Sequence, residues 1–236
     1  MKTLKTLFAT LLFMAIGILA ASAKNVEIVS KNFQIKSFSS VKANTVANIV
    51  YTQSDLVSVR VDGLRELVDH VIIKEDNGLL TIENDIELNN KNNISLVVFI
   101  SSPTLKSIET YGNGNLSLKG KVEIDNLTIK SYGIGRVQAL NLQTEKVCVR
   151  YDGIGDLELG GTTQMVEIYS TGVGNIDCEN LIAYNAIVRS EKIGKVKCFA
   201  SKTIGLYNEG VGEITYHGNP THINLQNVGM GRISKG

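Results

Sequence analysis

The chain has 236 residues, with 24 basic and 23 acidic side chains, few aromatic residues and no tryptophan. This length suits one domain or two small ones. Nucleic-acid binding requires a basic field, so a chain so close to neutral is not expected to bind nucleic acid. The lack of tryptophan argues against a dedicated platform for stacking sugars.

The first 23 residues have the pattern of a signal peptide. Lys2 and Lys5 give a positive start, residues 7–19 are apolar, and Ala21-Ser22-Ala23 is a small-x-small cleavage site. The apolar run is shorter than the ~20 residues that a membrane-spanning helix needs. We therefore expect export to the periplasm or the cell surface, with no membrane span after cleavage.

Residues 24–105 read as short strands without a marker that repeats. Gly63 to His70 is a candidate short helix. We expect this part to form irregular early turns that cap one end of the core. The predicted strands are Val26–Ile28, Phe33–Ile35, Val46–Val50, Val57–Val61, Val71–Ile73, Leu79–Ile82 and Ile94–Ile100.

Residues 106–236 contain a repeat marked by Gly-x-Gly. Its copies begin 18 to 21 residues apart, and the fifth copy is degenerate, with lysine in place of the first glycine. Such a period is typical of a solenoid. The copies begin at Gly112, Gly133, Gly153, Gly172, Lys192, Gly210 and Gly229.

Aligning the copies produces columns that alternate between apolar and polar residues. One column, two residues after the second glycine, reads Leu116, Val137, Leu157, Ile176, Val196, Ile214 and Ile233. This alternation predicts half-buried strands on both sides of a glycine corner. Copies without helices that align in register predict an all-β parallel β-helix, in which each coil of the chain, or rung, pairs with the next.

The copies also resemble a known family. Gly133-Ile134-Gly135, Gly153-Ile154-Gly155 and Gly172-Val173-Gly174, together with the stretch from Phe33 to Glu83, are similar to the head GIN domain of the auto-transporter adhesin family of Bacteroidetes. The resemblance implies a right-handed β-helix, export and a role in adhesion, with no catalytic residues to carry over. Because the last copy ends near Gly236, we expect no translocator domain after it.

One outward column is the candidate binding surface. It lies three residues before each first glycine, where basic and tyrosine side chains share one face. Such side chains can hold acidic glycans or a protein partner; a plain solvent face is the alternative. The candidates are Lys130, Arg150, Tyr169, Arg189 and Tyr207.

A second outward column places two carboxylates on adjacent rungs. Glu158 and Asp177 could hold a cation or share a proton, whereas a solvated charge ladder is the alternative reading. The three histidines have no partners at the spacing of a zinc site. Neither a metal nor a cofactor is therefore expected.

The three cysteines fall in two kinds of column. Cys178 and Cys198 share one inward column on adjacent rungs, where either buried thiols or a disulfide could form; buried thiols are favoured. Cys148 falls in an outward column.

Three functions remain open. The favoured one is a noncatalytic exported module that binds a surface glycan or an envelope protein. The alternatives are a structural envelope component and a polysaccharide-active enzyme. If the final rung leaves strand edges unpaired, these would invite a homo-oligomer or a cap.

Overall fold

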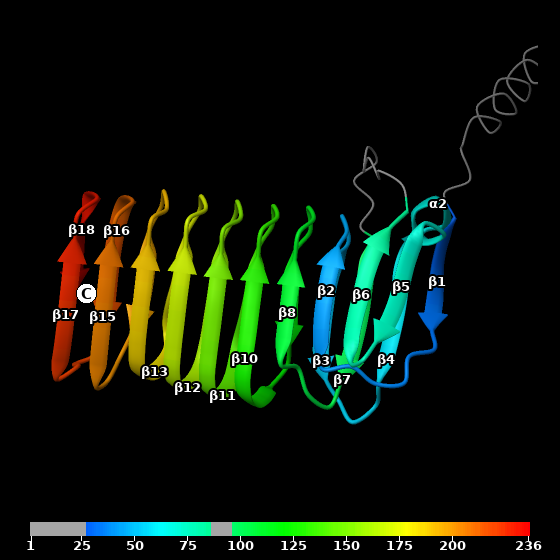
Figure 1. Cartoon of the computed structure of the whole chain (residues 1–236), viewed down its shortest axis with the longest axis horizontal. Helices are drawn as coiled ribbons and strands as arrows, with labels where there is room; N and C mark the ends of the chain where they lie inside the picture. The colour runs from blue at the N-terminus through cyan, green and yellow to red at the C-terminus, as the bar shows by residue number, and fades with distance from the viewer. Residues whose placement is uncertain (1–26, 86–95) are drawn as a thin grey trace, which may run out of the picture.

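The computed structural model describes residues 27–85 and 96–236. These residues form an elongated stack of β-strands, with N-terminal elements at one end and C-terminal strands at the other (Figure 1). The predicted signal peptide, residues 1–23, lies outside the described residues. No helix in the described part of the chain is long and apolar enough to cross a membrane.

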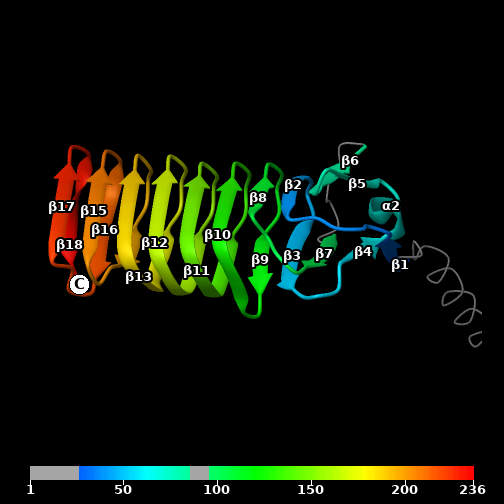
Figure 2. The ribbon, with the colours of Figure 1, turned by 60° about the horizontal axis from the view of Figure 1, so that its bottom comes forward.

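The glycine-marked half forms the regular part of the stack. Each strand pairs in parallel with the strand that carries the same columns in the next rung, as in the twelve in-register pairs that join β11 and β12. The all-β solenoid is thereby confirmed (Figure 2). The strands are β9 (Leu116–Lys119), β10 (Val122–Ser131), β11 (Val137–Tyr151), β12 (Leu157–Ser170), β13 (Ile176–Ser190), β14 (Val196–Phe199), β15 (Thr203–Asn208), β16 (Val211–His217), β17 (His222–Asn227) and β18 (Met230–Lys235).

The predicted inward columns form the core. From Leu116 to Ile214, the column two residues after the second glycine is at most 2% exposed. The column that contains Cys178 and Cys198 is also buried. Alternation along each strand therefore separates a shared interior from two outer sheets.

The corner glycines have two physical reasons to be glycine. Gly174 has φ +135°, a backbone conformation that side chains with a Cβ disfavour. Gly172 has no such angle, but a Cβ there would overlap the carbonyl oxygen of Gly153 in the preceding rung. Close stacking at Gly172 and the turn itself at Gly174 therefore favour glycine, although Lys192 takes the first glycine's place in one corner.

The middle residues of the corners point into solvent. The apolar members from Ile134 to Met230 are 44–77% exposed, and the residues from Asn113 to Val211 are joined by single β-bridges. The corner therefore presents a narrow aliphatic ridge along one edge of the stack. Its apolar members are Ile134, Ile154, Val173, Ile193, Val211 and Met230.

The N-terminal part supplies further rungs and a cap. The short helix falls within the segment predicted to be helical, Gly63 to His70. Strands β2 and β8 were not predicted from the sequence. The elements are β1 (Ile28–Phe33), β2 (Ser40–Asn44), β3 (Asn48–Gln53), β4 (Ser58–Leu64), α2 (Arg65–Val68), β5 (Val71–Asp76), β6 (Leu79–Asn84), β7 (Val97–Ser102) and β8 (Ser107–Thr110).

The rungs at this end do not follow chain order. β2 lies between β6 and β8, and β3 lies between β7 and β9, all in parallel pairs. Figure 1 shows the same order across the stack. Beyond them, β4 and β1 pair antiparallel, as do β5 and β6, which ends the regular stacking.

Candidate functional site

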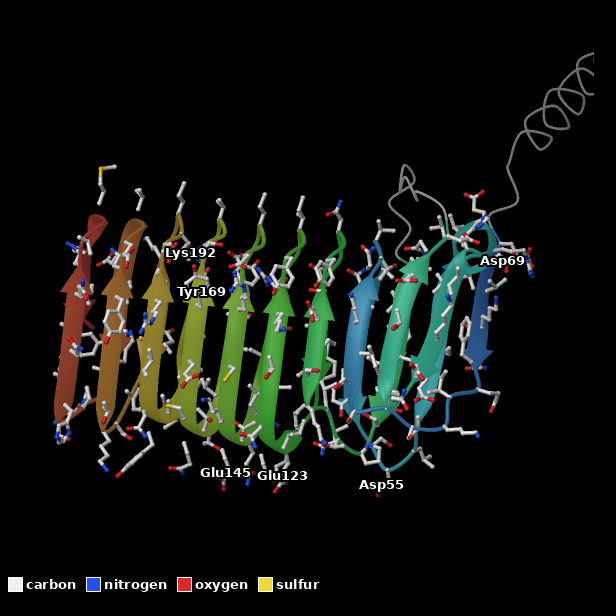
Figure 3. The ribbon with its side chains drawn as sticks, viewed as in Figure 1. Asp55, Asp69, Glu123, Glu145, Tyr169 and Lys192 are labelled. Atoms are coloured by element: carbon white, nitrogen blue, oxygen red, sulfur yellow. The ribbon has the colours of Figure 1, made fainter. Side chains whose placement is uncertain are left out.

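The predicted binding residues form one continuous column. Lys130, Arg150, Tyr169, Arg189 and Tyr207, here called the basic–tyrosine strip, are direct neighbours on consecutive parallel strands from β10 to β15. Adjacent strands of a sheet lie about 4.8 Å apart, so the strip repeats at that interval. Figure 3 shows Tyr169 on the outer side of this sheet.

Guanidinium groups cover two of the tyrosine rings. The guanidinium carbon of Arg150 lies 5.0 Å from the ring centre of Tyr169, and that of Arg189 lies 4.8 Å from the ring of Tyr207. Cation–π contacts of this kind stabilise exposed pairs by about 0.5–1 kcal/mol. They favour this arrangement of the strip in the absence of a ligand.

Neighbouring carboxylates compensate most of the positive charge. Arg150 Nε donates to Asp152 at 2.6 Å, and Lys130 Nζ lies 3.8 Å from Glu109. Arg189 has no carboxylate partner among the described residues. The strip therefore offers ordered hydrogen-bonding groups with little net charge.

Tyr169 shares this network of side chains. Its hydroxyl donates to Glu191 at 3.1 Å, and this hydrogen bond raises the pKa of the Tyr169 phenol. Asn224 donates to the hydroxyl of Tyr207 at 3.1 Å. Both phenol hydroxyls therefore have a side-chain hydrogen-bond partner.

Three further residues extend the strip and were missed in the sequence. Tyr111 and Tyr132 stack with their ring centres 5.0 Å apart, and Lys42 Nζ lies 5.4 Å from the ring centre of Tyr111. Lys42 joins the same column because β2 pairs with β8. The tyrosines could have been found, since both directly precede a corner glycine, whereas Lys42 is placed only by the insertion of its rung.

A shallow hollow of about 460 Å³ lies beside the strip. Lys130, Arg150, Tyr169 and Arg189 line it, together with Cys148. Burial raises the pKa of the Cys148 thiol, which lies 3.6 Å from Glu167. The hollow therefore offers a partly apolar floor edged by hydrogen-bonding groups.

A second hollow, of about 480 Å³, lies at the opposite edge of the stack. Glu123 and Glu145 line it, and Figure 3 shows both at that edge, away from Tyr169. Threonines and other short polar side chains fill much of its wall. Tyr184 also lines it, and Lys202 Nζ lies 4.9 Å from the ring centre of Tyr184, so a cation–tyrosine pair lies at this hollow too.

The predicted carboxylate pair is in register on the other sheet. Glu158 and Asp177 are direct neighbours. Gln138 donates to Glu158 at 2.9 Å, and Lys197 Nζ lies 3.9 Å from Asp177 and 3.0 Å from Glu179. Within residues 27–85 and 96–236, no group of three His, Cys, Asp or Glu side chains is placed to hold a metal ion. Glu158 thus accepts from an amide, and Asp177 has a lysine beside it.

The core contains two thiols and one amine. Cys178 and Cys198 are in register, buried and free, and burial raises the pKa of Cys198 to about 12. Lys192, which replaces a corner glycine, is 1% exposed, and its Nζ has no hydrogen-bond partner in the described structure. Sequence reasoning noted the replacement but not that this side chain is buried.

The family model described as "Putative auto-transporter adhesin, head GIN domain" matches residues 37–220. The chain belongs to this family. The match covers the inserted rung, the cap apart from β1, and the regular rungs apart from β17 and β18 of the GIN-domain protein.

Solved structures share the fold of this GIN-domain protein. A putative adhesin from Bacteroides fragilis is 31% identical, with a TM-score of 0.84 over 89% of this chain and 97% of that chain. A putative lipid binding protein from Parabacteroides distasonis is 20% identical, with a TM-score of 0.63 over 90% of this chain and 98% of that one. A putative adhesin from Parabacteroides distasonis is 18% identical, with a TM-score of 0.68 and the same coverage. No curated protein matches the sequence.

Proposed function

We propose that this GIN-domain protein is a noncatalytic exported module that binds a surface glycan on the basic–tyrosine strip. The observation that carries the proposal is the unbroken column from Lys130 to Tyr207 on consecutive strands. The description of its family and of a 31% identical structure as putative adhesins supports a binding role. Export rests on the signal-peptide pattern of residues 1–23.

The compensated charge of the strip favours a ligand recognised through hydrogen bonds. The sequence suggested an acidic glycan, but Asp152 and Glu109 offset the charges of Arg150 and Lys130. Charged donors and acceptors form stronger hydrogen bonds than neutral ones. A glycan rich in hydroxyl groups suits this pattern better than a polyanion, which would need a net positive field.

The repeated spacing of the strip favours an extended ligand. Each rung places one donor or ring about 4.8 Å from the next, and the hollow beside Tyr169 runs across several rungs. A polymer can contact many such positions at once. The binding free energies of weak contacts at each rung then add along the polymer.

A glycan array compares the exported protein with a variant that carries Arg150→Ser, Tyr169→Ser, Arg189→Ser and Tyr207→Ser. The matched control carries Glu158→Gln and Asp177→Asn on the other sheet. We expect the first variant to lose glycan binding and the control to keep it, with unchanged circular dichroism in both. Equal binding by all three proteins would show that the strip is not the site.

An envelope pull-down with the same proteins separates the two classes of ligand. Capture of an envelope protein by the parent chain, with no glycan bound on the array, would overturn the glycan proposal. If the strip variant lost that capture, the strip would remain the interaction surface with a protein partner.

A further inference from the structure

The last described rung leaves one end of the core open. β17 pairs with β15 and β18 pairs with β16, and neither strand has a second β partner among the described residues. Ile223 and Leu225 are 51% and 43% exposed, whereas Ile204 and Leu206, their neighbours in the same columns, are fully buried. A further strand would cover these two core positions.

Strand β17 lacks the usual protection of an edge. Soluble proteins discourage pairing at exposed edges with charged residues, proline or bulges. The six residues of β17, His222 to Asn227, include no Asp, Glu, Lys or Arg. At the opposite end, β5 carries Lys74, Glu75 and Asp76. The unpaired backbone of β17 is therefore open to a strand partner.

The two ends of the stack cannot continue each other. At the N-terminal end, β1, β4 and β5 run antiparallel to their neighbours, and helix α2 buries Leu67 and Val68 there. A second copy added head to tail would meet this cap rather than a parallel rung. Of the two ends of another copy, the open end therefore fits the same end, not the capped one.

We propose that two copies of this chain associate through β17 in an antiparallel, two-fold arrangement. Centred on Asn224, this register sets Ile223 of each copy opposite Leu225 of the other, so that apolar side chains face each other. In a parallel strand, N–H groups alternate between its two edges. Because His222 N–H bonds toward β15, the N–H groups of Ile223 and Leu225 face the free edge and can bond the second copy.

The pairing would also place both binding strips on one face. β17 belongs to the sheet that carries the strip, since Gln226 pairs with Tyr207. A two-fold axis normal to this sheet makes the sheet continuous across the dimer. Two strips on one face would let a polymer engage both copies, and linked sites raise the overall affinity.

Sedimentation velocity over a wide range of protein concentrations tests the association. The parent chain is expected to form dimers, and Leu225→Lys to remain monomeric. Ile182→Lys, which changes a side chain of similar exposure far from this end, should leave the dimer intact. A monomeric parent chain, or a dimer that survives Leu225→Lys, would overturn the proposal.

Cysteine cross-linking tests the register. In a Cys148→Ser background, Asn224→Cys is expected to form a disulfide between copies under a mild oxidant, because residue 224 faces itself at about 4.5 Å between Cα atoms. Gln226→Cys, on the same face of β17, would face His222 and should cross-link poorly. Equal cross-linking by both variants, or none by Asn224→Cys, would refute this register.

Discussion

Replacing Lys192 with methionine is expected to stabilise the protein by about 3 kcal/mol near neutral pH. Lys192 is buried, and its Nζ makes no hydrogen bond within the described residues. Burial lowers the pKa of Lys192 from 10.5 to about 8, although nearby Asp156 and Cys178 act in the opposite direction. The folded protein therefore disfavours the charged amine.

The magnitude follows from this difference in pKa. Each pKa unit corresponds to about 1.4 kcal/mol between the two protonation states, and the pKa falls by about 2.5 units. Below pH 8, both the folded and unfolded chains hold the proton, so the full cost is present. Between about pH 8 and 10.5, only the unfolded chain holds it, and the stability of the parent protein rises with pH. Methionine, unbranched and uncharged, removes this cost.

Denaturant unfolding near pH 7 and near pH 10 measures the effect. The gain from Lys192→Met should be large near pH 7 and mostly gone near pH 10. Burial raises the pKa values of Cys178 and Cys198, so their titration affects stability in the opposite sense. Cys198 contributes equally to both proteins, whereas Cys178 interacts with Lys192. The difference between parent and variant therefore reports Lys192 together with its interaction with Cys178.

Lys195→Met is the matched control, because Lys195 is exposed in the same rung. It should change stability by less than about 0.5 kcal/mol at either pH. A gain from Lys192→Met that is equal at both pH values would refute the reasoning, since it would come from packing rather than charge. A loss of stability near pH 7 would refute it as well.

Three further outcomes are expected. Gly172→Ala should destabilise the protein by more than about 2 kcal/mol in thermal unfolding, because the added Cβ would overlap the Gly153 carbonyl. Gly205→Ala should have little effect, because its Cβ would lie 3.5 Å from its nearest neighbour. Similar losses of stability at both sites would contradict this prediction. In the folded protein, iodoacetamide should label Cys148 alone, as measured by mass spectrometry, because Cys178 and Cys198 are buried. Rapid labelling of either buried thiol would show that the core opens. Tyr169→Phe should lower the phenol absorbance change at high pH. It should weaken glycan binding less than Tyr169→Ser does, because the ring stays under Arg150. Equal losses of glycan binding in the two variants would assign binding to the hydroxyl.

Much of the candidate site could be predicted from the sequence because the repeat converts chain position into spatial position. With a period of 18 to 21 residues, Arg150 and Tyr169 had to be neighbours if each rung paired with the next. The same argument placed Glu158 beside Asp177 and Cys178 beside Cys198. Alternation along each strand then decided which columns face the core.

The N-terminal rungs could not be ordered in this way. No sequence repeat relates β2 to β6 or β8. The place of β2 between those two strands depends on long-range pairing. Lys42 therefore could not be assigned to the strip from the sequence, and only the folded structure places it there. The burial of Lys192 and the outward corner ridge also depend on how successive corners stack.

The sequence by itself determined the β-solenoid fold of this chain, because Gly-x-Gly and alternation recur in register and only stacked coils can bury the resulting apolar columns. Tertiary structure alone decided the threading of the inserted rung and the burial of Lys192. These depend on contacts between residues far apart in the chain, which a local pattern does not encode.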